Sequence, residues 1–501
     1  MIKIKKALLI TAIATLAVTQ ASAALRFDPQ AGEPRQLVMP AGDTIHYTAF
    51  EKLFFVTNVE DSAYQFMNVY VPQGATQQSP IFLRTYVGGY MASAAGQPQA
   101  GDASGRALKE GFVVAIPGSR GRNSTVTATR NVKAAGVKKG RTLFTGRAPA
   151  AILDLKAAIR YLRFFDEVMP GDANKIITDG TSAGGAMSAL MGATGNHPDY
   201  EPLLQAMGAA ATRDDVLAAV CFCPITDLDH ADMAYEWLYN GTTSRRQGDP
   251  SVLAISNELK AQFPAYVNSL GLTKPDGTPL TSHNYLDFIK QEIIRAAQIA
   301  KNAGADIPDS LGFTFSHEAS FGAPPINGGM AGHKPPMMRP RGGKSKPGDY
   351  IVDLDMERYL NYVVSTQPLK TAPAFDTQGV AGQAPSGENE EFGSAAGSSA
   401  NFTVYAASKA GVALDPAVAR NARLLNPMNY IGDRQACVAP HWYIRHGARD
   451  RDTAFSVPVN LALKLQNADC DVDFLLAWNR PHSGDYALDD LFAWIRHILG
   501  E

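Results

Sequence analysis

One serine of this 501-residue chain stands in a local pattern that would make it a nucleophile. Residues 175–185 run from a short apolar strand through Gly-Thr-Ser-Ala-Gly into a helix of small residues, which places Ser182 in the turn. A nucleophile elbow has this form, and it holds the serine hydroxyl exposed above a sheet. Glycine is needed at positions 180 and 184 because side chains there would collide with the neighbouring strand and helix. The alternative interpretation is a serine that caps an ordinary helix; the strand before it favours the nucleophile.

A nucleophilic serine needs a histidine to take its proton and an acid to orient that histidine. In α/β-hydrolases the chain order is serine, acid, histidine, each on a loop at the C-terminal edge of the sheet. Of the ten histidines, His482 alone has this order and follows a predicted strand, Val472–Trp478. Asp450 and Asp452 follow the predicted strand 441–446. Asp450 is nearer the strand end and is the expected acid, whereas Asp452 is either the alternative acid or the cap of the next helix.

A glycine pair earlier in the chain would contribute to an oxyanion hole. The predicted strand Ile81–Val87 leads into Gly88, Gly89 and Tyr90 on a turn. In a serine hydrolase of this layout, that loop donates one backbone N–H and the residue after the nucleophile donates another. Gly89 and Ala183 are therefore the expected oxyanion-hole donors, and a plain turn is the alternative interpretation of the glycine pair.

Together these residues predict ester hydrolysis through an acyl-enzyme. His482 would deprotonate Ser182, which attacks the ester carbonyl while the oxyanion hole holds the negative oxygen. An alcohol leaves, and water repeats the sequence to release the acid. This chemistry requires no metal and no cofactor, and none is expected.

The elements that must position these residues alternate between strands and helices. An amphipathic helix at Ala148–Phe165 precedes the elbow, and further helices are expected at Ala454–Gln466 and Tyr486–Leu499. The predicted strands are Lys52–Val56, Phe66–Val71, Ile81–Val87, Gly111–Ile116, the elbow strand, Val216–Pro224, 441–446 and Val472–Trp478. Such alternation indicates an α/β fold with a parallel sheet.

Two segments are expected to be irregular. Residues 24–50 are polar, and residues 118–146 are glycine-rich and basic, so the basic side chains of the second segment should form a solvated face. Asp154, in the amphipathic helix, is expected to be a surface or ion-pairing acid.

The strand–helix alternation breaks at Ile225 and resumes near residue 430. The intervening block contains helical stretches, long irregular segments and, at 321–350, a run crowded with Gly, Pro, Lys and Arg. A block of this kind between two halves of a sheet is typical of an inserted lid domain. The predicted organisation is a signal peptide at 1–23, an α/β-hydrolase core at 24–224 and 431–501, and an inserted lid domain at 225–430.

The first 23 residues have the form of a secretory signal, with three lysines, an apolar run and the cleavage site Ala21-Ser22-Ala23. We therefore expect export to the periplasm or the medium, with cleavage near Ala23. Cleavage would remove three lysines and no acids and change the formal net charge from −2 to about −5, which argues against a nucleic-acid partner. No other stretch would insert stably into a membrane.

The four cysteines are too few for a disulfide scaffold, and their spacing fits no zinc motif. Cys221 and Cys223 stand two apart in an apolar strand and are badly placed to bond each other. A bridge between Cys437 and Cys470 stays open, as does the oligomeric state.

Several motifs taken together resemble bacterial tannases (tannin acylhydrolases). They are Gly180–Gly185, Cys223–His230, Pro368–Asp376, Gly387-Glu388-Asn389, and His446-Gly447 leading to Asp450-Arg451-Asp452. The resemblance covers most of the chain after the signal, from the Gly88-Gly89 loop to His482. It implies an α/β-hydrolase core with a lid domain that hydrolyses galloyl esters, with Ser182, Asp450 and His482 matching the family's triad.

The same resemblance implies a binding site for the galloyl ring. Its members would be Lys370, Glu388 and Asp452, with Ile225 against the ring. A galloyl ring presents three adjacent phenolic hydroxyls, and two carboxylates with one ammonium can saturate that edge. Without the resemblance, Lys370 and Glu388 would be interpreted as surface charge on the lid.

Two alternatives compete with a galloyl esterase. A feruloyl esterase or general carboxylesterase would use the same triad on a different acyl group. A hydrolase-fold binding protein without activity would not need the triad, and the complete set of serine, aspartate and histidine in the right order argues against it.

Overall fold

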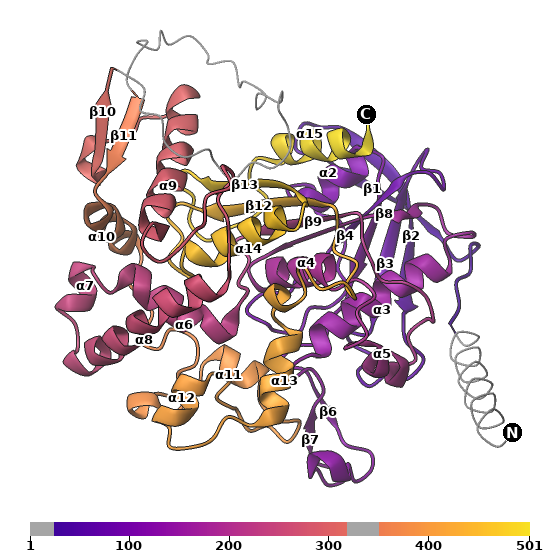
Figure 1. Cartoon of the computed structure of the whole chain (residues 1–501). Coiled ribbons are helices and arrows are strands. Elements are labelled where there is room, and N and C mark those ends of the chain that lie inside the picture. The colour runs from indigo at the N-terminus through magenta and orange to yellow at the C-terminus, as the bar shows by residue number, and fades with distance from the viewer. Residues whose placement is uncertain (1–24, 318–349) are drawn as a thin grey trace, which may run out of the picture.

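The computed structural model describes residues 25–317 and 350–501, so the predicted signal peptide and nearly all of the 321–350 stretch lie outside the described residues. Its centre is a nine-stranded sheet of order β1-β2-β3-β5-β4-β8-β9-β12-β13 (Figure 1). The strands are β1 (Glu33–Val38), β2 (Thr44–Phe54), β3 (Phe66–Pro72), β4 (Pro80–Arg84), β5 (Val113–Pro117), β8 (Asp172–Thr181), β9 (Ala218–Phe222), β12 (His441–Gly447) and β13 (Asp471–Ala477). The strands from β5 to β13 in this order are parallel, and β1, β2 and β3 pair antiparallel at the other end.

Helices cover both faces of this sheet. The cluster of buried hydrophobic residues on one face of the sheet includes residues of α2 and α15. The larger hydrophobic cluster on the other face includes residues of α3, α4 and α14 (Figure 1). The helices of this part are α2 (Ala103–Lys109), α3 (Ala150–Phe164), α4 (Ala183–Ala193), α5 (Glu201–Met207), α14 (Ser456–Asn467) and α15 (Leu488–Leu499). Strands β4, β5 and β9 are buried along their whole length, as expected of parallel strands covered on two faces.

The chain between β9 and β12 contributes no strand to the central sheet in its described residues. Its elements are α6 (Leu228–Tyr239), α7 (Thr243–Arg246), α8 (Pro250–Ser269), α9 (Tyr285–Asn302), the pair β10 (Phe313–Ser316) and β11 (Tyr350–Leu354), α10 (Met356–Thr366), α11 (Gly387–Glu391), α12 (Val404–Lys409) and α13 (Pro416–Leu424). We call this segment the insertion. It contacts the sheet at its β13 edge, where Arg295 donates a hydrogen bond to the Phe474 carbonyl at 2.7 Å.

The expectation that residues 24–50 are irregular is wrong, because β1 and the first seven of the eleven residues of β2 lie there. Most residues of β1 are exposed, so this edge strand lacks the apolar alternation that marks a half-buried strand. It is held by antiparallel pairing with β2 from Glu33 opposite Ala49 to Val38 opposite Thr44. The glycine-rich segment 118–146 also contains a short hairpin, β6 (Thr125–Thr127) with β7 (Thr142–Phe144).

The expectation that the basic side chains of that segment form a solvated face is wrong for Arg120, whose side chain is 4% exposed. Its guanidinium lies 2.9 Å from the carboxylate of Asp154, which is fully buried on α3, and it also pairs with Glu60. A buried carboxylate needs such a partner, because an uncompensated charge in the core is strongly unfavourable. Arg122 of the same segment is half-buried and pairs with Glu390. The remaining basic residues of the segment are exposed: Arg130, Lys133, Lys138, Lys139 and Arg141.

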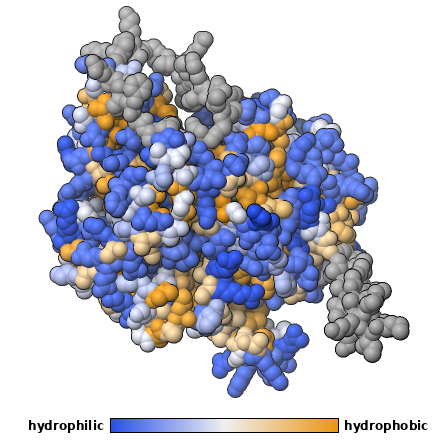
Figure 2. Space-filling view, viewed as in Figure 1, coloured by the Kyte–Doolittle hydropathy of each residue, from blue (hydrophilic) through white to orange (hydrophobic). Residues whose placement is uncertain are grey.

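All four cysteines are free, so the bridge left open between Cys437 and Cys470 is absent, and Cys437 is exposed. Among the residues in the two described ranges, no helix is long and apolar enough to cross a membrane. The face of the molecule in Figure 2 is predominantly hydrophilic, with hydrophobic side chains in separate patches.

Candidate active site

The predicted nucleophile stands in a strained turn. β8 ends at Thr181, α4 begins at Ala183, and Ser182 between them has φ 63° and ψ −124°. A non-glycine residue adopts a positive φ at an energetic cost, and such residues cluster at active sites. The turn closes only around glycines, because a Cβ added at position 180 would lie 2.3 Å from the Gly184 carbonyl oxygen. The Ser182 N–H donates to the Phe222 carbonyl at 2.9 Å, which fixes the turn to β9.

The predicted base and acid meet at the ends of neighbouring strands. His482, on the loop after β13, lies with Nδ1 2.7 Å from Oδ2 of Asp450, on the loop after β12. The Asp452 N–H donates to the other Asp450 oxygen at 2.8 Å, whereas the Asp452 carboxylate is 3.8 Å from His482 Nδ1. This geometry favours Asp450 over Asp452 as the orienting acid. Asp452 does not cap the next helix, since α14 begins at Ser456 after Phe455.

Electrostatics suit this pairing. Burial raises the pKa of Asp450, but the neighbouring imidazoles of His446 and His482 and the hydrogen bonds from His482 and Asp452 outweigh it and lower that pKa to about 2. Burial lowers the pKa of His482, but the hydrogen bond and charge of Asp450 and the charge of Asp452 raise it overall. Asp450 is thus ionised at neutral pH and stabilises the imidazolium that forms when His482 takes a proton.

One cavity of about 220 Å³ gathers nearly all of the predicted site residues. Its lining is Gly89, Tyr90, Ser182, Ala183, Ile225, Lys370, Glu388, Asp452 and His482. Of the nine residues that the sequence analysis singles out, only Asp450 is not among the lining residues, and it is buried in contact with His482. The cavity therefore brings together the predicted nucleophile, base, oxyanion donors and ring-binding residues.

Tyr90, expected only as part of the oxyanion loop, also has a side-chain role that sequence reasoning missed. It follows Gly89 in the oxyanion loop, both have positive φ, and the Tyr90 side chain is buried. Its hydroxyl donates to the Ile225 carbonyl at 2.7 Å, and the Ile225 N–H donates to the Ser182 carbonyl at 3.3 Å. The loop that carries Gly89 is thereby tied to the elbow that carries Ala183. The only signal in the sequence was the tyrosine next to the glycine pair.

Lys370 lies on an irregular segment of the insertion and is held by contacts to neighbouring helices and to Phe375. Its ammonium is 3.9 Å from the centroid of the Phe375 ring, and its backbone N–H donates to the Tyr235 hydroxyl at 3.1 Å. Its carbonyl accepts a hydrogen bond from Arg245 at 3.0 Å, and Arg245 is paired with Glu236 in the core. The position of Lys370 therefore depends on contacts to α6 and α7.

Glu388 stands in the first turn of the short helix α11, whose start is fixed by a buried asparagine. The Asn389 amide oxygen accepts hydrogen bonds at 3.0 Å from the backbone N–H groups of Thr377, Gln378 and Ser386. Its amide nitrogen donates to the buried carboxylate of Asp376 at 2.6 Å. Sequence reasoning found Asn389 and Asp376 only as parts of motifs, without this role.

Arg122 joins the two halves of the cavity wall. Its Nε donates to the Gly89 carbonyl at 2.9 Å, and its guanidinium forms an ion pair with Glu390 of α11. Gly387 leaves room for this side chain, because a Cβ there would lie 3.1 Å from Arg122 Cζ. The oxyanion loop and the helix that carries Glu388 are therefore linked by Arg122, a residue expected from the sequence to lie on a solvated face.

Comparisons with known proteins agree with this arrangement. A family model described as BD-FAE matches residues 140–268. The sequence is 47% identical over 55 residues to Esterase LipC of Mycobacterium tuberculosis, a match that spans 11% of this chain and 14% of that esterase.

Solved structures of bacterial tannases are similar to this chain over nearly its whole length. The tannin acyl hydrolase of Lactobacillus plantarum has a TM-score of 0.78 and 37% identity, with 94% of this chain and 98% of that chain covered. The Fusobacterium nucleatum tannase has a TM-score of 0.78 and 34% identity, covering 95% and 99%. A tannin acyl hydrolase in complex with ethyl gallate has a TM-score of 0.77 and 36% identity, covering 94% and 98%. The expected α/β-hydrolase class and the resemblance are confirmed: the chain is a carboxylic-ester hydrolase that belongs to the bacterial tannase family.

Proposed function

We propose that this protein is a serine esterase that hydrolyses galloyl esters to gallic acid and an alcohol through an acyl-enzyme. The observation that carries the proposal is the cavity, in which Ser182 and His482 share a wall with Lys370, Glu388 and Asp452. A similar solved structure is described as a complex with ethyl gallate, which supports the same acyl group here.

The chemical step uses the core residues. Asp450 holds His482 through Nδ1, which leaves Nε2 as the ring nitrogen that can take the Ser182 proton. The backbone N–H groups of Gly89 and Ala183 would stabilise the oxyanion, and His482 would then protonate the leaving alcohol. Water attacks the acyl-enzyme by the same route and releases the acid.

Recognition of the acyl group uses the rest of the wall. Lys370 can donate to phenolic oxygens, whereas Glu388 and Asp452 can accept from phenolic hydroxyls. Ile225 supplies an apolar surface for the ring face. The volume of about 220 Å³ is below the range of drug-sized pockets, about 300–1,000 Å³, so the cavity suits a small acyl group.

The test is the dependence on phenolic hydroxyls. Removing Glu388 or Lys370 leaves buried hydroxyls unpaired, at about 1–3 kcal/mol each, so kcat/KM should fall roughly ten- to a hundredfold. We expect this loss for methyl gallate and almost none for methyl benzoate in Glu388→Ala and Lys370→Ala. The matched controls are Glu258→Ala and Lys409→Ala, an exposed ion pair of the insertion that is 2.6 Å apart and away from the cavity.

Equal losses on the two esters would show that Glu388 and Lys370 support the fold and would remove the galloyl assignment. Faster wild-type turnover of methyl ferulate or of a short aliphatic ester than of methyl gallate would favour a feruloyl esterase or general carboxylesterase.

We also propose that residues 225–430 act as a lid domain and that the chain is exported. The insertion supplies Lys370 and Glu388 but neither nucleophile nor base, which supports a role in substrate selection. Insertion variants that fold should keep their reactivity toward an organophosphate directed at Ser182. For export, the mass of the protein recovered from periplasm and medium should correspond to a chain that begins after Ala23.

A further inference from the structure

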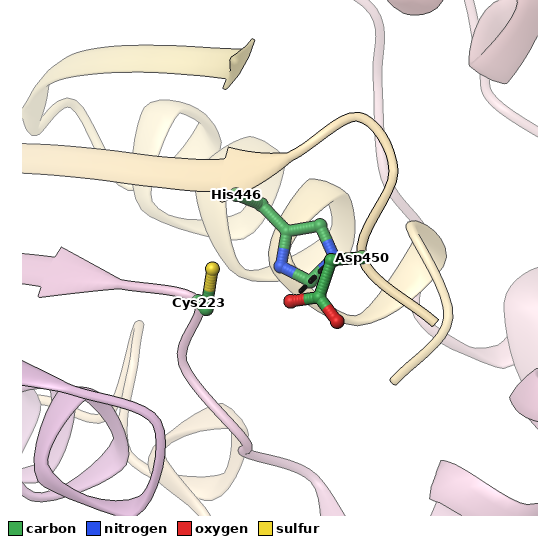
Figure 3. A group of neighbouring side chains, drawn as sticks. All are labelled: Cys223, His446 and Asp450. Carbon is green, nitrogen blue, oxygen red and sulfur yellow. Dashed lines mark ion pairs between the residues drawn. The ribbon is translucent and has the colours of Figure 1, made fainter. Parts of the chain in front are cut away.

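A second group of side chains with metal-binding chemistry lies behind the catalytic acid. Cys223, just after β9, and His446, on β12, lie beside Asp450 (Figure 3). One ligand atom from each residue lies within 4.8 Å of the others, and all three residues are buried. His446 Nε2 lies 3.7 Å from Asp450 Oδ2.

His446 is the unusual member of this group. Its side chain is 0% exposed, and neither ring nitrogen has a hydrogen-bond partner among the described residues. Buried polar atoms are nearly always hydrogen-bonded, so an imidazole without such a bond calls for a ligand or a function. Figure 3 shows that the ring faces both the Cys223 sulfur and the Asp450 carboxylate.

We propose that Cys223, His446 and Asp450 form a site for a divalent cation of zinc-like softness, and that occupation of this site inhibits the esterase. Thiolate, imidazole and carboxylate are the three side-chain ligands that zinc takes. Two anionic ligands and one neutral imidazole also balance a charge of +2, so the filled site would bury no net charge.

The three ligand atoms are close enough to bind one cation after a small movement of the Cys223 side chain. Ligand atoms of a tetrahedral zinc site lie about 3.3–3.8 Å apart, given bond lengths of about 2.0–2.3 Å. The 3.7 Å between His446 and Asp450 is already in that range, and the Cys223 sulfur is within 4.8 Å of both partners. A rotation of the cysteine side chain would complete three positions, and water would take the fourth.

Inhibition follows from the shared use of Asp450. The same Oδ2 atom that lies near His446 accepts the hydrogen bond from His482 at 2.7 Å. A cation bound to this carboxylate neutralises its charge and competes for that oxygen, so His482 loses the group that orients it and stabilises its protonated form.

Binding is tested without reference to catalysis. Chelator-treated full-length protein is titrated with Co²⁺, whose complex with a thiolate shows a sulfur-to-cobalt band in the near ultraviolet, and with Zn²⁺ by calorimetry. We expect one cation per chain and a band that is lost in Cys223→Ala and strongly reduced in His446→Gln. The matched control is Cys437→Ala, which removes an exposed cysteine outside the cluster and should keep the band.

Inhibition is measured with a simple ester, each variant relative to its own metal-free rate. Saturating Zn²⁺ should slow the wild type by at least about a hundredfold, because loss of the orienting acid costs up to about 10⁴, and a chelator should restore the rate. Cys223→Ala should be slowed less than about twofold. Circular dichroism and thermal melts test whether each variant is folded. If Cys223→Ala does not fold, His446→Gln replaces it as the variant without the metal site.

Three outcomes would overturn the proposal. The first is no sulfur-to-cobalt band in the wild type, and the second is a band that survives in Cys223→Ala. The third is undiminished inhibition of Cys223→Ala, which would place the cation at the other nearby group, Asp450, Asp452 and His482. The claim that the cation inhibits the esterase rests on the proposed triad, whereas the cobalt band depends only on the metal site. The two measurements therefore distinguish failure of the triad from failure of the metal site.

Discussion

The two halves of the cavity wall are built by different means. Ser182, Asp450 and His482 follow β8, β12 and β13, which lie within four consecutive parallel strands of the central sheet. Lys370 and Glu388 come from irregular or single-turn segments of the insertion, distant in sequence from every strand of that sheet. The order and direction of the strands therefore position the catalytic residues, which we call the core half. Side-chain hydrogen bonds position Lys370 and Glu388, which we call the insertion half.

The core half is tightly interlocked at the level of the backbone. A Cβ added at Gly447 would lie 2.3 Å from the Arg480 carbonyl, so the acid loop and the histidine loop touch. A Cβ at Gly484 would lie 1.9 Å from the Thr181 side chain, which brings the histidine loop against the nucleophile elbow. Contacts of this kind leave little freedom for the three catalytic loops to move apart.

The insertion half is held by buried polar groups. Asp376 accepts hydrogen bonds from Asn389, Asn401 and the backbone of Phe402 and Thr403. A network of this kind is stable while every member is satisfied and fails when one member is removed. The recognition half should therefore be the more sensitive to single polar substitutions, and the catalytic half the more dependent on its reacting groups.

The largest effect should come from the reacting groups. Ser182→Ala and His482→Ala should each lower turnover of every ester by about 10⁶, because members of a triad act as a unit. The measurement is kcat on methyl gallate and on methyl benzoate with protein purified free of host esterases. Turnover within tenfold of the wild type in either variant would contradict the assignment.

The next effect separates the two aspartates. Asp450→Asn should lower kcat by about 10⁴ on both esters, because it loses the charge and the correct tautomer of His482. Asp452→Asn should act mainly on methyl gallate, since its carboxylate lines the cavity and is 3.8 Å from His482 Nδ1. A larger loss on methyl benzoate in Asp452→Asn than in Asp450→Asn would reverse the two roles.

A third prediction tests the hydrogen-bond network of the insertion. Asn389→Ala leaves three backbone N–H groups without their acceptor, at about 1–3 kcal/mol each, so the melting temperature should fall measurably. Specificity for methyl gallate over methyl benzoate should fall roughly tenfold as Glu388 loses its position. Asn268→Ala, an exposed asparagine of the insertion that bonds to Ser282, is the control. Unchanged specificity with lower stability would mean that the network supports the fold alone.

A fourth prediction concerns the link between the halves. Arg122→Ala removes the contacts to both Gly89 and Glu390, so kcat/KM should fall about tenfold on both esters. Glu390→Gln keeps the Gly89 contact and should lose only a few-fold, mainly on methyl gallate. Equal effects of the two variants on methyl benzoate would show that Arg122 does not position the oxyanion loop.

The smallest effect is a shift of the pH profile. His482 acts as a base only when neutral, and its pKa is raised from 6.5, so kcat/KM should fall as the pH drops through a midpoint above 6.5. The Asp452 charge contributes to that rise. Asp452→Asn should therefore move the midpoint to lower pH on methyl benzoate, and a shift to higher pH would be inconsistent with this electrostatic origin.

Sequence alone was sufficient for features that are local or follow from strand order. The elbow at Ser182 is recognisable because a strand, two glycines and a helix are consecutive residues. Asp450 and His482 could be chosen because parallel strands bring their C-terminal loops to one edge. The α/β class followed from periodicity in the same way, and the galloyl-binding residues came from resemblance rather than from pattern.

Only the tertiary structure decided the features that join distant segments. Arg122 and Glu390, which form an ion pair, are 268 positions apart in the sequence. Cys223 and His446 come from two different strand regions of the sheet, and buried Arg120 pairs with buried Asp154 of another element. Residue type and spacing do not encode such partners, because a basic residue in a glycine-rich loop is solvated unless another segment folds over it. Burial and charge pairing are properties of the packed chain, because they depend on segments that are distant from one another in the sequence.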